Sequence, residues 1–337
     1  MILVTGGTGL VGSHLLYELA ATNNKVKASI RPSSNISKVR KVFGYYTDKA
    51  KADALFERIE WILADINDIP SLELAFKEVT EVYHCAALIS FDPSDEQRMR
   101  KINIEGTANI VNLCIANQVS RLCFVSSVAA IGSPLKGSSV DEKSKWNSEE
   151  NHNDYAISKY GAEIEVWRGT QEGLDAVIVN PGVIIGPGFW NSGSGKIFNK
   201  IDKGLDYHFP KVTGFVGVRD TVKSMMTLMN SSEKNQQYII VSENLSFERV
   251  FKETARYMDR TPPSKRLKKW MIALGWIFQK IGSWFGGKRQ ITRASIHGLY
   301  EEVYFDNTSI RNSLDFDFTP MSRVLEETAK FYKADKN

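Results

Sequence analysis

Short apolar segments alternate with helical segments along the first half of this 337-residue chain. Residues rich in apolar and β-branched side chains predict six strands, at 2–5, 26–30, 59–64, 81–85, 122–126 and 176–180. Helical periodicity lies between them at 13–21, 70–79, 98–118 and 155–168. Strands that alternate with helices pair in parallel through right-handed crossovers. The pattern therefore predicts an α/β fold built on a doubly wound parallel sheet.

A glycine-rich turn joins the first predicted strand to the first predicted helix. Gly6, Gly9 and Gly12 are spaced three residues apart. At such a position the first glycine permits a tight turn, the second lets the backbone approach a pyrophosphate, and the third lets the helix pack on the strand. A plain strand–helix turn is the structural alternative. The place of the motif after the opening strand favours dinucleotide binding, as in a Rossmann-type domain.

The end of the second strand bears on the choice of dinucleotide. A carboxylate there would hold a free ribose 2′-hydroxyl, but the strand runs into Arg31 and Ser33 instead. Arginine neutralises a phosphate well, so we predict NADP, with NAD as the alternative. A solvated surface arginine is the structural interpretation of Arg31. Asp65, which follows the third strand, either accepts a hydrogen bond from adenine or starts the next helix.

The alternation ends after Pro181. Glycine and serine gather over 186–195, and a helix and a strand that suit the sheet return at 219–229 and 237–241. Helices are then predicted at 247–259, 265–285 and 321–333. We predict a dinucleotide-binding domain over residues 1–186, to which 215–243 returns. A smaller, mostly helical substrate-binding lobe is predicted over 187–214 and 244–337.

Tyr155 and Lys159 are spaced four residues apart in a predicted helix and so share one face. A free phenol, with a pKa near ~10, is a poor acid or base at neutral pH. A nearby ammonium and a positive nicotinamide ring would both lower that pKa. Ser126 and Ser127 end the fifth strand, where ligands of parallel sheets bind. A surface pair is the usual interpretation of Tyr-x-x-x-Lys, but the glycine turn and the strand-end serines favour an active site.

These motifs together resemble the extended short-chain dehydrogenase/reductase family, also called the NAD(P)-dependent epimerase/dehydratase family. The matching segments occur in the family's order, and a looser resemblance follows at 218–220 and in the helical tail. The segments are 5–12 (TGGTGLVG), 65–68 (DIND), 84–87 (HCAA), 103–107 (NIEGT), 126–127 (SS), Tyr155 with Lys159, and 180–182 (NPG).

The resemblance implies that Ser127 orients the substrate and that Tyr155 is the acid/base. It implies that Lys159 holds the ribose hydroxyls and tunes Tyr155, while His84 is structural. No metal is expected. The expected cofactor-binding residues are Gly6, Thr8, Gly9, Leu10, Val11, Gly12, Arg31, Ser33, Asp65, Ile66, Cys85, Ala86, Ala87, Asn103, Tyr155, Lys159, Pro181, Gly182 and Val183.

Two stretches indicate a branch of the family. Nucleotide-sugar members usually carry an arginine shortly before a Val-x-Asp element, and 213–218 has none, since Arg219 comes later. Segments 30–32 and 181–188 are instead similar to the dihydroflavonol-reductase and 3β-hydroxysteroid-dehydrogenase-like branch, which reduces ketones or aldehydes on bulky, often apolar molecules. Side chains that suit such a pocket, or equally the core of the lobe, are Phe189, Trp190, His208 and Phe209.

The predicted function is therefore that of an NADP-dependent oxidoreductase. It would reduce a ketone or aldehyde group of a bulky, apolar small molecule, with hydride from the nicotinamide and a proton from Tyr155. A nucleotide-sugar epimerase or dehydratase is the first alternative, and there the hydride returns to the same substrate. A non-catalytic NAD(P)-binding sensor or assembly factor on the same fold is the second. The intact Ser127, Tyr155 and Lys159 argue against it.

Composition limits the partners and the location. The chain has 43 lysines and arginines against 39 aspartates and glutamates, and its basic residues are scattered, so nucleic acid is not an expected partner. Its three cysteines lie in apolar segments, which favours a reducing compartment. A strand predicted directly after Met1 leaves no room for a signal peptide. No apolar run reaches the ~18 residues of a membrane span, so we expect a cytoplasmic protein.

Segment 268–285 is crowded with tryptophan, phenylalanine, isoleucine and methionine between basic ends. Four interpretations compete: core of the lobe, a lid over the substrate, the face of a homodimer, and a helix at a membrane surface. Apolar residues surround the whole predicted helix rather than forming one stripe. This distribution favours burial over membrane contact.

Overall fold

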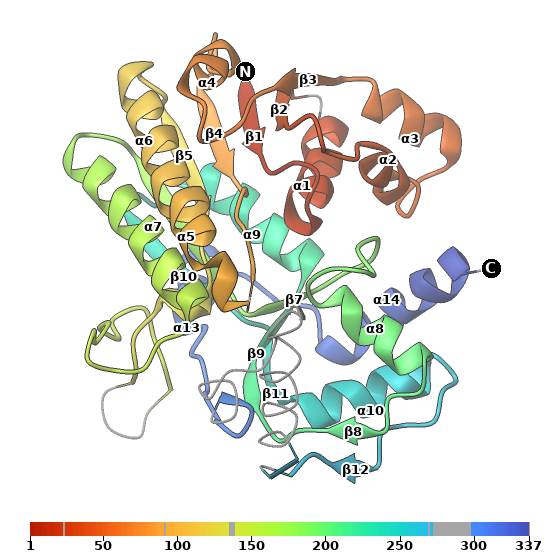
Figure 1. The fold of residues 1–337 in the computed structure, drawn as a ribbon. Coiled ribbons are helices and arrows are strands. Elements are labelled where there is room, and N and C mark those ends of the chain that lie inside the picture. The colour runs from red at the N-terminus through yellow and green to blue at the C-terminus, as the bar shows by residue number, and fades with distance from the viewer. Residues whose placement is uncertain (23, 91, 135–138, 269, 272–297, 337) are drawn as a thin grey trace.

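A computed structural model describes residues 1–22, 24–90, 92–134, 139–268, 270–271 and 298–336. In this part of the chain the centre is a seven-stranded parallel sheet in the order β10-β6-β5-β4-β1-β2-β3 (Figure 1). Its strands are β1 Ile2–Thr5, β2 Val26–Ile30, β3 Ile59–Leu63, β4 Glu81–His84, β5 Arg121–Val125, β6 Ala176–Pro181 and β10 Gln236–Ile240. The predicted doubly wound α/β fold is confirmed.

Helices cover both faces of this sheet (Figure 1). One face packs against α1 Leu10–Ala21, α2 Ser37–Phe43, α3 Lys49–Phe56 and α9 Val218–Met229. The other packs against α4 Ile69–Ala75, α6 Gly106–Ala116 and α7 Asp154–Gln171. A short helix, α5 Glu96–Met99, leads into α6 through a π-helical turn at Arg100–Glu105. Because both faces are covered, β1 and β6 are buried along their whole length, which explains their largely apolar sequences.

The chain reverses its direction across the sheet between β1 and β4. Strands β1, β2 and β3 follow one another outward on one side, and β4, β5 and β6 on the other. Ligands of doubly wound sheets bind at such a switch point, outside the carboxyl ends of the strands. The predicted site residues Gly6, Arg31, Cys85, Ser127 and Gly182 each follow a strand that ends at this edge. The topology therefore gathers residues that are far apart in sequence.

The chain beyond β6 builds a second layer with its own sheet. Strands β7 Val183–Ile185, β9 Val212–Gly217 and β11 Glu243–Ser246 form it, in the order β11-β9-β7. Helices α8 Gly195–Asp202, α10 Phe247–Tyr257 and α14 Met321–Lys336 bury their apolar faces with this sheet. A shorter helix, α13 Thr308–Leu314, contacts β10. The expectation of a mostly helical lobe missed this sheet.

The predicted helix at 265–285 is wrong at its start. Lys265–Arg266 forms strand β12, which pairs in parallel with β8 Tyr207–His208. Most of 268–285 lies outside the described residues, so its four interpretations stay predictions. Strand β10 pairs with β6 in the large sheet, which agrees with the prediction that residues 215–243 return to the dinucleotide-binding domain. The division into two domains, at the boundaries given above, also stays a prediction.

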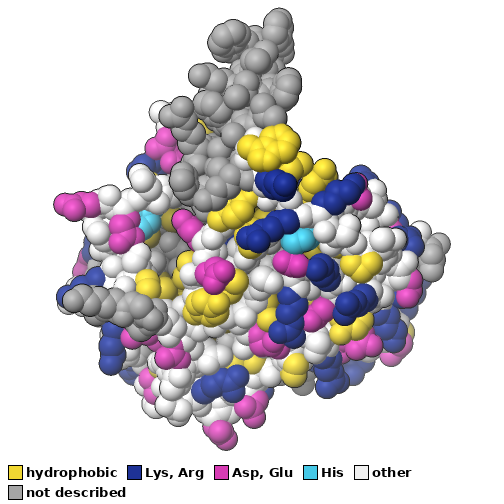
Figure 2. All heavy atoms as spheres, turned by 90° about the horizontal axis from the view of Figure 1, so that it is seen from below, with side chains coloured by type: hydrophobic (Ala, Val, Ile, Leu, Met, Phe, Trp, Pro, Cys, Tyr) yellow, Lys and Arg dark blue, Asp and Glu magenta, His cyan; other side chains and the backbone are white. Residues whose placement is uncertain are grey.

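Charged side chains of both signs are interspersed on the face shown in Figure 2. Lysines and arginines lie next to aspartates and glutamates there rather than forming a separate stripe. In the described part of the chain, no helix combines the length and the apolar character that crossing a bilayer requires.

Candidate active site

The glycine turn is tight because side chains would not fit in it. A Cβ atom on Gly6, whose φ is +70°, would lie 2.6 Å from the backbone nitrogen of Ala86. A Cβ on Gly12 would lie 2.3 Å from the carbonyl oxygen of Gly6. Helix α1 starts after Gly9 with no side-chain cap and no acidic residue in its first turn. Its N–H groups and dipole therefore suit a pyrophosphate, and the predicted cofactor fits this turn.

Replacing Gly12 with alanine tests this fit. We expect the Kd for NADPH to rise about 5- to 150-fold, because forcing a methyl group into a tight contact costs ~1–3 kcal/mol. The measurement is a fluorescence titration with the dinucleotide. Gly44→Ala is the matched control, since Gly44 has a φ of −65° at the end of α2 and its Cβ would lie 3.3 Å from the nearest atom. Equal affinities of the two variants would contradict the role of the turn.

The end of β2 leaves a cationic side chain open to solvent. Arg31 and Ser33 are both exposed. Ser34 folds the loop by accepting a hydrogen bond from the Arg31 backbone nitrogen at 3.0 Å. Among the described residues, Arg31 forms no ion pair, so its guanidinium is available to an anion.

Asp65 and Ile66 shape the turn after β3. Asp65 Oδ1 accepts a hydrogen bond from the backbone nitrogen of Asn67 at 2.9 Å, which is the local, turn-forming role. Ile66 is buried and lies where a Cβ on Gly106 would approach its side chain to 2.6 Å. Asp65 therefore shapes the turn before Asp68, the N-cap of α4, and Ile66 packs against α6 at Gly106.

The end of β4 is held by buried polar groups. His84 joins β1 to α6, because its Nδ1 lies 2.6 Å from Thr5 Oγ1 and its Nε2 lies 3.0 Å from Thr107 Oγ1. Burial lowers the pKa of His84 to about 3, so the ring is neutral at physiological pH. The backbone of Cys85 and Ala86 then lies directly against Gly6. His84 thus has the structural role expected for it.

Asn103 positions the loop that follows β4. Its Oδ1 accepts from the Leu88 backbone nitrogen at 2.7 Å, and its Nδ2 donates to the Leu88 carbonyl and to Ser158 Oγ, both at 2.9 Å. The side chain is almost fully buried. Because protein groups contact both ends of its amide, Asn103 shapes the wall of the site, and its contact with a cofactor stays a prediction.

Ser127 and Tyr155 come together beside the carboxyl end of β5. Ser127 follows β5, and Tyr155 lies in the first turn of α7, whose N-cap Asn153 accepts from the Ala156 backbone nitrogen at 2.8 Å. A hydrogen bond with Ser127 lowers the pKa of Tyr155, but burial has the larger effect and raises it to about 12. The phenol is therefore protonated at neutral pH.

Lys159 is nearly buried and faces the sheet. Its Nζ donates to the Val125 carbonyl at 2.8 Å and lies 4.3 Å from the centre of the Phe124 ring. Burial lowers the pKa of Lys159 to about 8. In the protein alone the ammonium is turned toward Val125 and burial of the phenol dominates, so the lowering of the Tyr155 pKa expected beside a nicotinamide ring stays a prediction.

The third part of the predicted cofactor site is the junction of the two sheets. Pro181 ends β6 and Val183 begins β7. Between them, Gly182 donates its N–H to the Ile240 carbonyl at 3.1 Å. A Cβ on Gly182 would lie 2.3 Å from the Gly214 carbonyl oxygen. Glycine is thus required where the chain passes from the large sheet to the small one.

The model of the NAD dependent epimerase/dehydratase family matches residues 2–241. The chain belongs to this family. Its members are NAD(P)-dependent oxidoreductases and epimerases that act on small molecules, so the chain is an enzyme of the extended short-chain dehydrogenase/reductase type. The resemblance inferred from the motifs is confirmed.

Three curated relatives of this enzyme have different activities. Sterol demethylase protein B of Methylococcus capsulatus is 29% identical over 74% of this chain and 71% of its own length. UDP-glucose 4-epimerase of Vibrio cholerae is 26% identical over 85% of this chain and 82% of its own length. Dihydroflavonol 4-reductase of Hordeum vulgare is 26% identical over 72% of this chain and 71% of its own length. The crystal structure of gox2253 has a TM-score of 0.83 and 24% identity, and the match covers 99% of this chain and 98% of that one.

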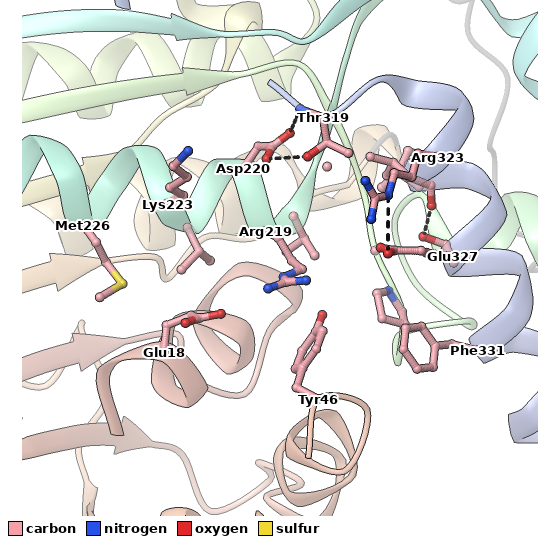
Figure 3. A pocket seen from close by; sticks show the side chains of 18 of the residues that line it. Glu18, Tyr46, Arg219, Asp220, Lys223, Met226, Thr319, Arg323, Glu327 and Phe331 are labelled. Atoms are coloured by element: carbon pink, nitrogen blue, oxygen red, sulfur yellow. Dashed lines mark hydrogen bonds and ion pairs between the residues drawn. The ribbon is translucent and has the colours of Figure 1, made fainter. Parts of the chain in front are cut away.

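A pocket of about 530 Å³ lies between α1, α9 and α14 (Figure 3). Arg219 lies in it with its guanidinium 5.2 Å from the centre of the Tyr46 ring. Asp220 accepts hydrogen bonds from the backbone and hydroxyl of Thr319, at 2.8 and 3.0 Å. None of the proposed catalytic residues lines this pocket. The Val218–Asp220 segment, which resembles the family's Val-x-Asp element, thus connects α9 to the segment before α14 through the Asp220–Thr319 hydrogen bonds.

Trp190 and Phe209, two of the residues considered for a substrate pocket, pack in the core of the lobe. Phe209 packs against Phe247, with ring centres 4.7 Å apart, and against Phe251 at 5.5 Å. Trp190 packs against Phe198 and Tyr332. Of the two interpretations given for these side chains, the structure supports the core.

Proposed function

We propose that this enzyme is an NADP-dependent reductase of a ketone or aldehyde on a bulky, largely apolar small molecule. The observation that carries the proposal is the Ser127–Tyr155 pair of hydroxyl groups beside the carboxyl end of β5, next to the β4–β1 switch point of the sheet. A carbonyl oxygen that gains a hydride needs a proton donor. Since the pKa of Tyr155 is raised to about 12, its phenol holds that proton at neutral pH.

The chain's own residues then have separate tasks. A bound nicotinamide would supply the hydride. Ser127 Oγ donates a hydrogen bond to the carbonyl oxygen and stabilises the negative charge that develops there. Tyr155 Oη transfers its proton to the same oxygen. Lys159, four residues along α7, supplies a positive charge that is bonded to the Val125 carbonyl, two residues before Ser127.

Two observations support NADP over NAD. Arg31 is exposed and forms no ion pair within the described residues, and β2 ends without a carboxylate. Arginine binds phosphate through a planar pair of donors, which suits a 2′-phosphate. NAD is the alternative, and parallel assays with the two dinucleotides distinguish them.

The substrate class is supported by the relatives and by the position of Arg219. Two of the three relatives carry names of a sterol enzyme and a flavonoid enzyme. Strand β9 contains no arginine, and Arg219 lies over Tyr46 in a pocket that excludes the catalytic residues. A sugar diphosphate would thus lack the cation that nucleotide-sugar enzymes use. The 26% identity to a UDP-glucose 4-epimerase keeps an epimerase as the second candidate.

A carbonyl screen tests the proposal. We expect purified enzyme to consume NADPH in step with reduction of at least one aromatic or steroid-like ketone or aldehyde, and to use NADH more slowly. The measurement follows the absorbance of NADPH and NADH in parallel, with product identified by mass spectrometry. Incubation with UDP-hexoses serves as the comparison. Conversion of a UDP-hexose without net loss of NADPH, and no carbonyl reduction, would establish the epimerase instead.

A further inference from the structure

A buried carboxylate lies next to the proposed catalytic residues. Glu163 follows Lys159 by four residues and Tyr155 by eight, so all three lie along one face of α7. This face packs against the sheet, and Glu163 and Lys159 are 4% and 2% exposed. Carboxylates are almost never buried to this degree unless they are paired. Glu163 is therefore expected to have a hydrogen-bonding or charged partner, or a functional role.

Asn180 connects Glu163 to the backbone of the proposed catalytic serine. Its Nδ2 donates to Glu163 Oε1 at 2.5 Å and to the Ser127 carbonyl at 3.1 Å. Asn180 itself is fully buried in β6. The contacts thus run without a gap from Glu163 on α7, through β6, to the end of β5. Hydrogen bonds to a carboxylate are short and strong, so this link holds Ser127 firmly.

Electrostatics connect Glu163 to Lys159. Burial lowers the pKa of Lys159 to about 8, and the charge of Glu163 acts against that lowering. In turn, burial raises the pKa of Glu163 to about 7, while hydrogen bonds to its side chain, including that from Asn180, and then the charge of Lys159 act against that rise. Each group thus favours the charged form of the other, against the effect of burial.

The other groups that face Lys159 carry no charge near neutral pH. On the β4 side these are His84 and Cys85, since burial lowers the pKa of His84 to about 3 and raises that of Cys85 to about 12. Tyr155, on α7 itself, is a neutral phenol. From β6, the neighbouring side chain is the neutral amide of Asn180. Among the described residues that face Lys159, Glu163 is therefore the group that can carry a negative charge at and above neutral pH.

We propose that Glu163 is a positioning residue: its carboxylate keeps Lys159 charged and, through Asn180, holds the backbone of Ser127. The inference rests on the proposed function, in which Ser127, Tyr155 and Lys159 carry out the chemistry. Family motifs up to residue 182 did not reveal Glu163. The signal in the sequence is its spacing of four from Lys159, which places an acid on the same helical face.

The test is Glu163→Gln, which keeps an oxygen for Asn180 and removes the charge. Without that charge Lys159 releases its proton more readily, so we expect the alkaline limb of the kcat/KM profile to move to lower pH by about one unit. Glu142→Gln is the matched control. Glu142 is also a partly buried carboxylate, bonded to the Ile239 backbone nitrogen at 2.8 Å beside β10, and its removal leaves the limb in place.

Glu163→Met, an apolar side chain of similar length, provides a second test should the amide prevent folding. We expect the same shift of the limb and a lower kcat than in Glu163→Gln, because the bond to Asn180 is also lost. Folding is checked by thermal unfolding and by binding of NADPH. Tyr155→Phe, assayed alongside, distinguishes a failure of the proposed function from a failure of the positioning role of Glu163. An unmoved limb in active Glu163 variants, together with loss of turnover in Tyr155→Phe, overturns the role of Glu163 alone.

Discussion

Tyr155→Phe is expected to lower kcat by about 10²–10⁴-fold, the range that a positioned general acid contributes. The substitution removes one oxygen atom and keeps the ring, so the packing of α7 against the sheet is retained. Because the proposed cofactor contacts lie mainly at the glycine turn and at Arg31, the Kd for NADPH should change little. Initial rates of carbonyl reduction and a dinucleotide titration measure the two effects separately.

Tyr160→Phe is the matched control for this substitution. Tyr160 lies on the same helix, five residues later, and its ring stacks on Trp146 at a distance of 4.3 Å between ring centres. It loses the same hydroxyl group without touching the Ser127–Tyr155 pair. We expect it to retain most of its activity. Normal turnover in Tyr155→Phe, or an equal loss in both variants, would sink the assignment of the proton donor.

The large sheet could be predicted from the sequence because its strands are buried on both faces. Strand β2 was predicted with the observed bounds, Val26–Ile30, and β6 was one residue longer than predicted. Unbroken apolar runs of this kind, followed by glycine or by helical periodicity, allow few other structures. The glycine turn was predictable for a related reason, since no residue with a side chain fits at Gly6 or Gly12.

The lobe could not be predicted as well because its strands are short and their partners are distant in sequence. Strand β7 has three residues and pairs with β9, almost thirty residues later. Strand β8 has two residues and pairs with β12. Such strands carry no periodicity of their own, and tertiary contacts determine them. In the first part of the chain, helices α2 and α3 were also missed. With seven and eight residues, they are too short to show a clear helical period.

The candidate site shows the same limit at the level of single side chains. Spacing on α7 placed Tyr155 and Lys159 on one face, but not the direction of the Lys159 ammonium, which depends on the Val125 carbonyl of another element. Burial, which no motif reports, has the largest effect on the pKa of Tyr155 in the protein alone and raises it. Glu163 was missed because its importance arises from burial next to Lys159 and Asn180.

Arg31→Ala is expected to lower kcat/KM with NADPH by about 10–100-fold and to change kcat/KM with NADH little. A hydrogen bond to a charged group contributes ~1.5–3 kcal/mol, and each 1.4 kcal/mol corresponds to a factor of ten. NADH has no 2′-phosphate, so the loss of the guanidinium removes nothing from its binding. The measurement is a set of initial rates with both dinucleotides at a fixed carbonyl concentration.

Arg40→Ala is the control, because Arg40 lies nearby on α2 but is already occupied. It pairs with Asp53 at 2.7 Å and with Glu57 at 2.6 Å. Its loss should alter both dinucleotides equally and weakly, since exposed ion pairs contribute little to stability. If Arg31→Ala instead weakened NADPH and NADH alike, Arg31 would act on the fold of the loop rather than on the phosphate. A wild-type preference for NADH would refute NADP as the cofactor, because Arg31 would then contribute no binding to the 2′-phosphate that distinguishes the two dinucleotides.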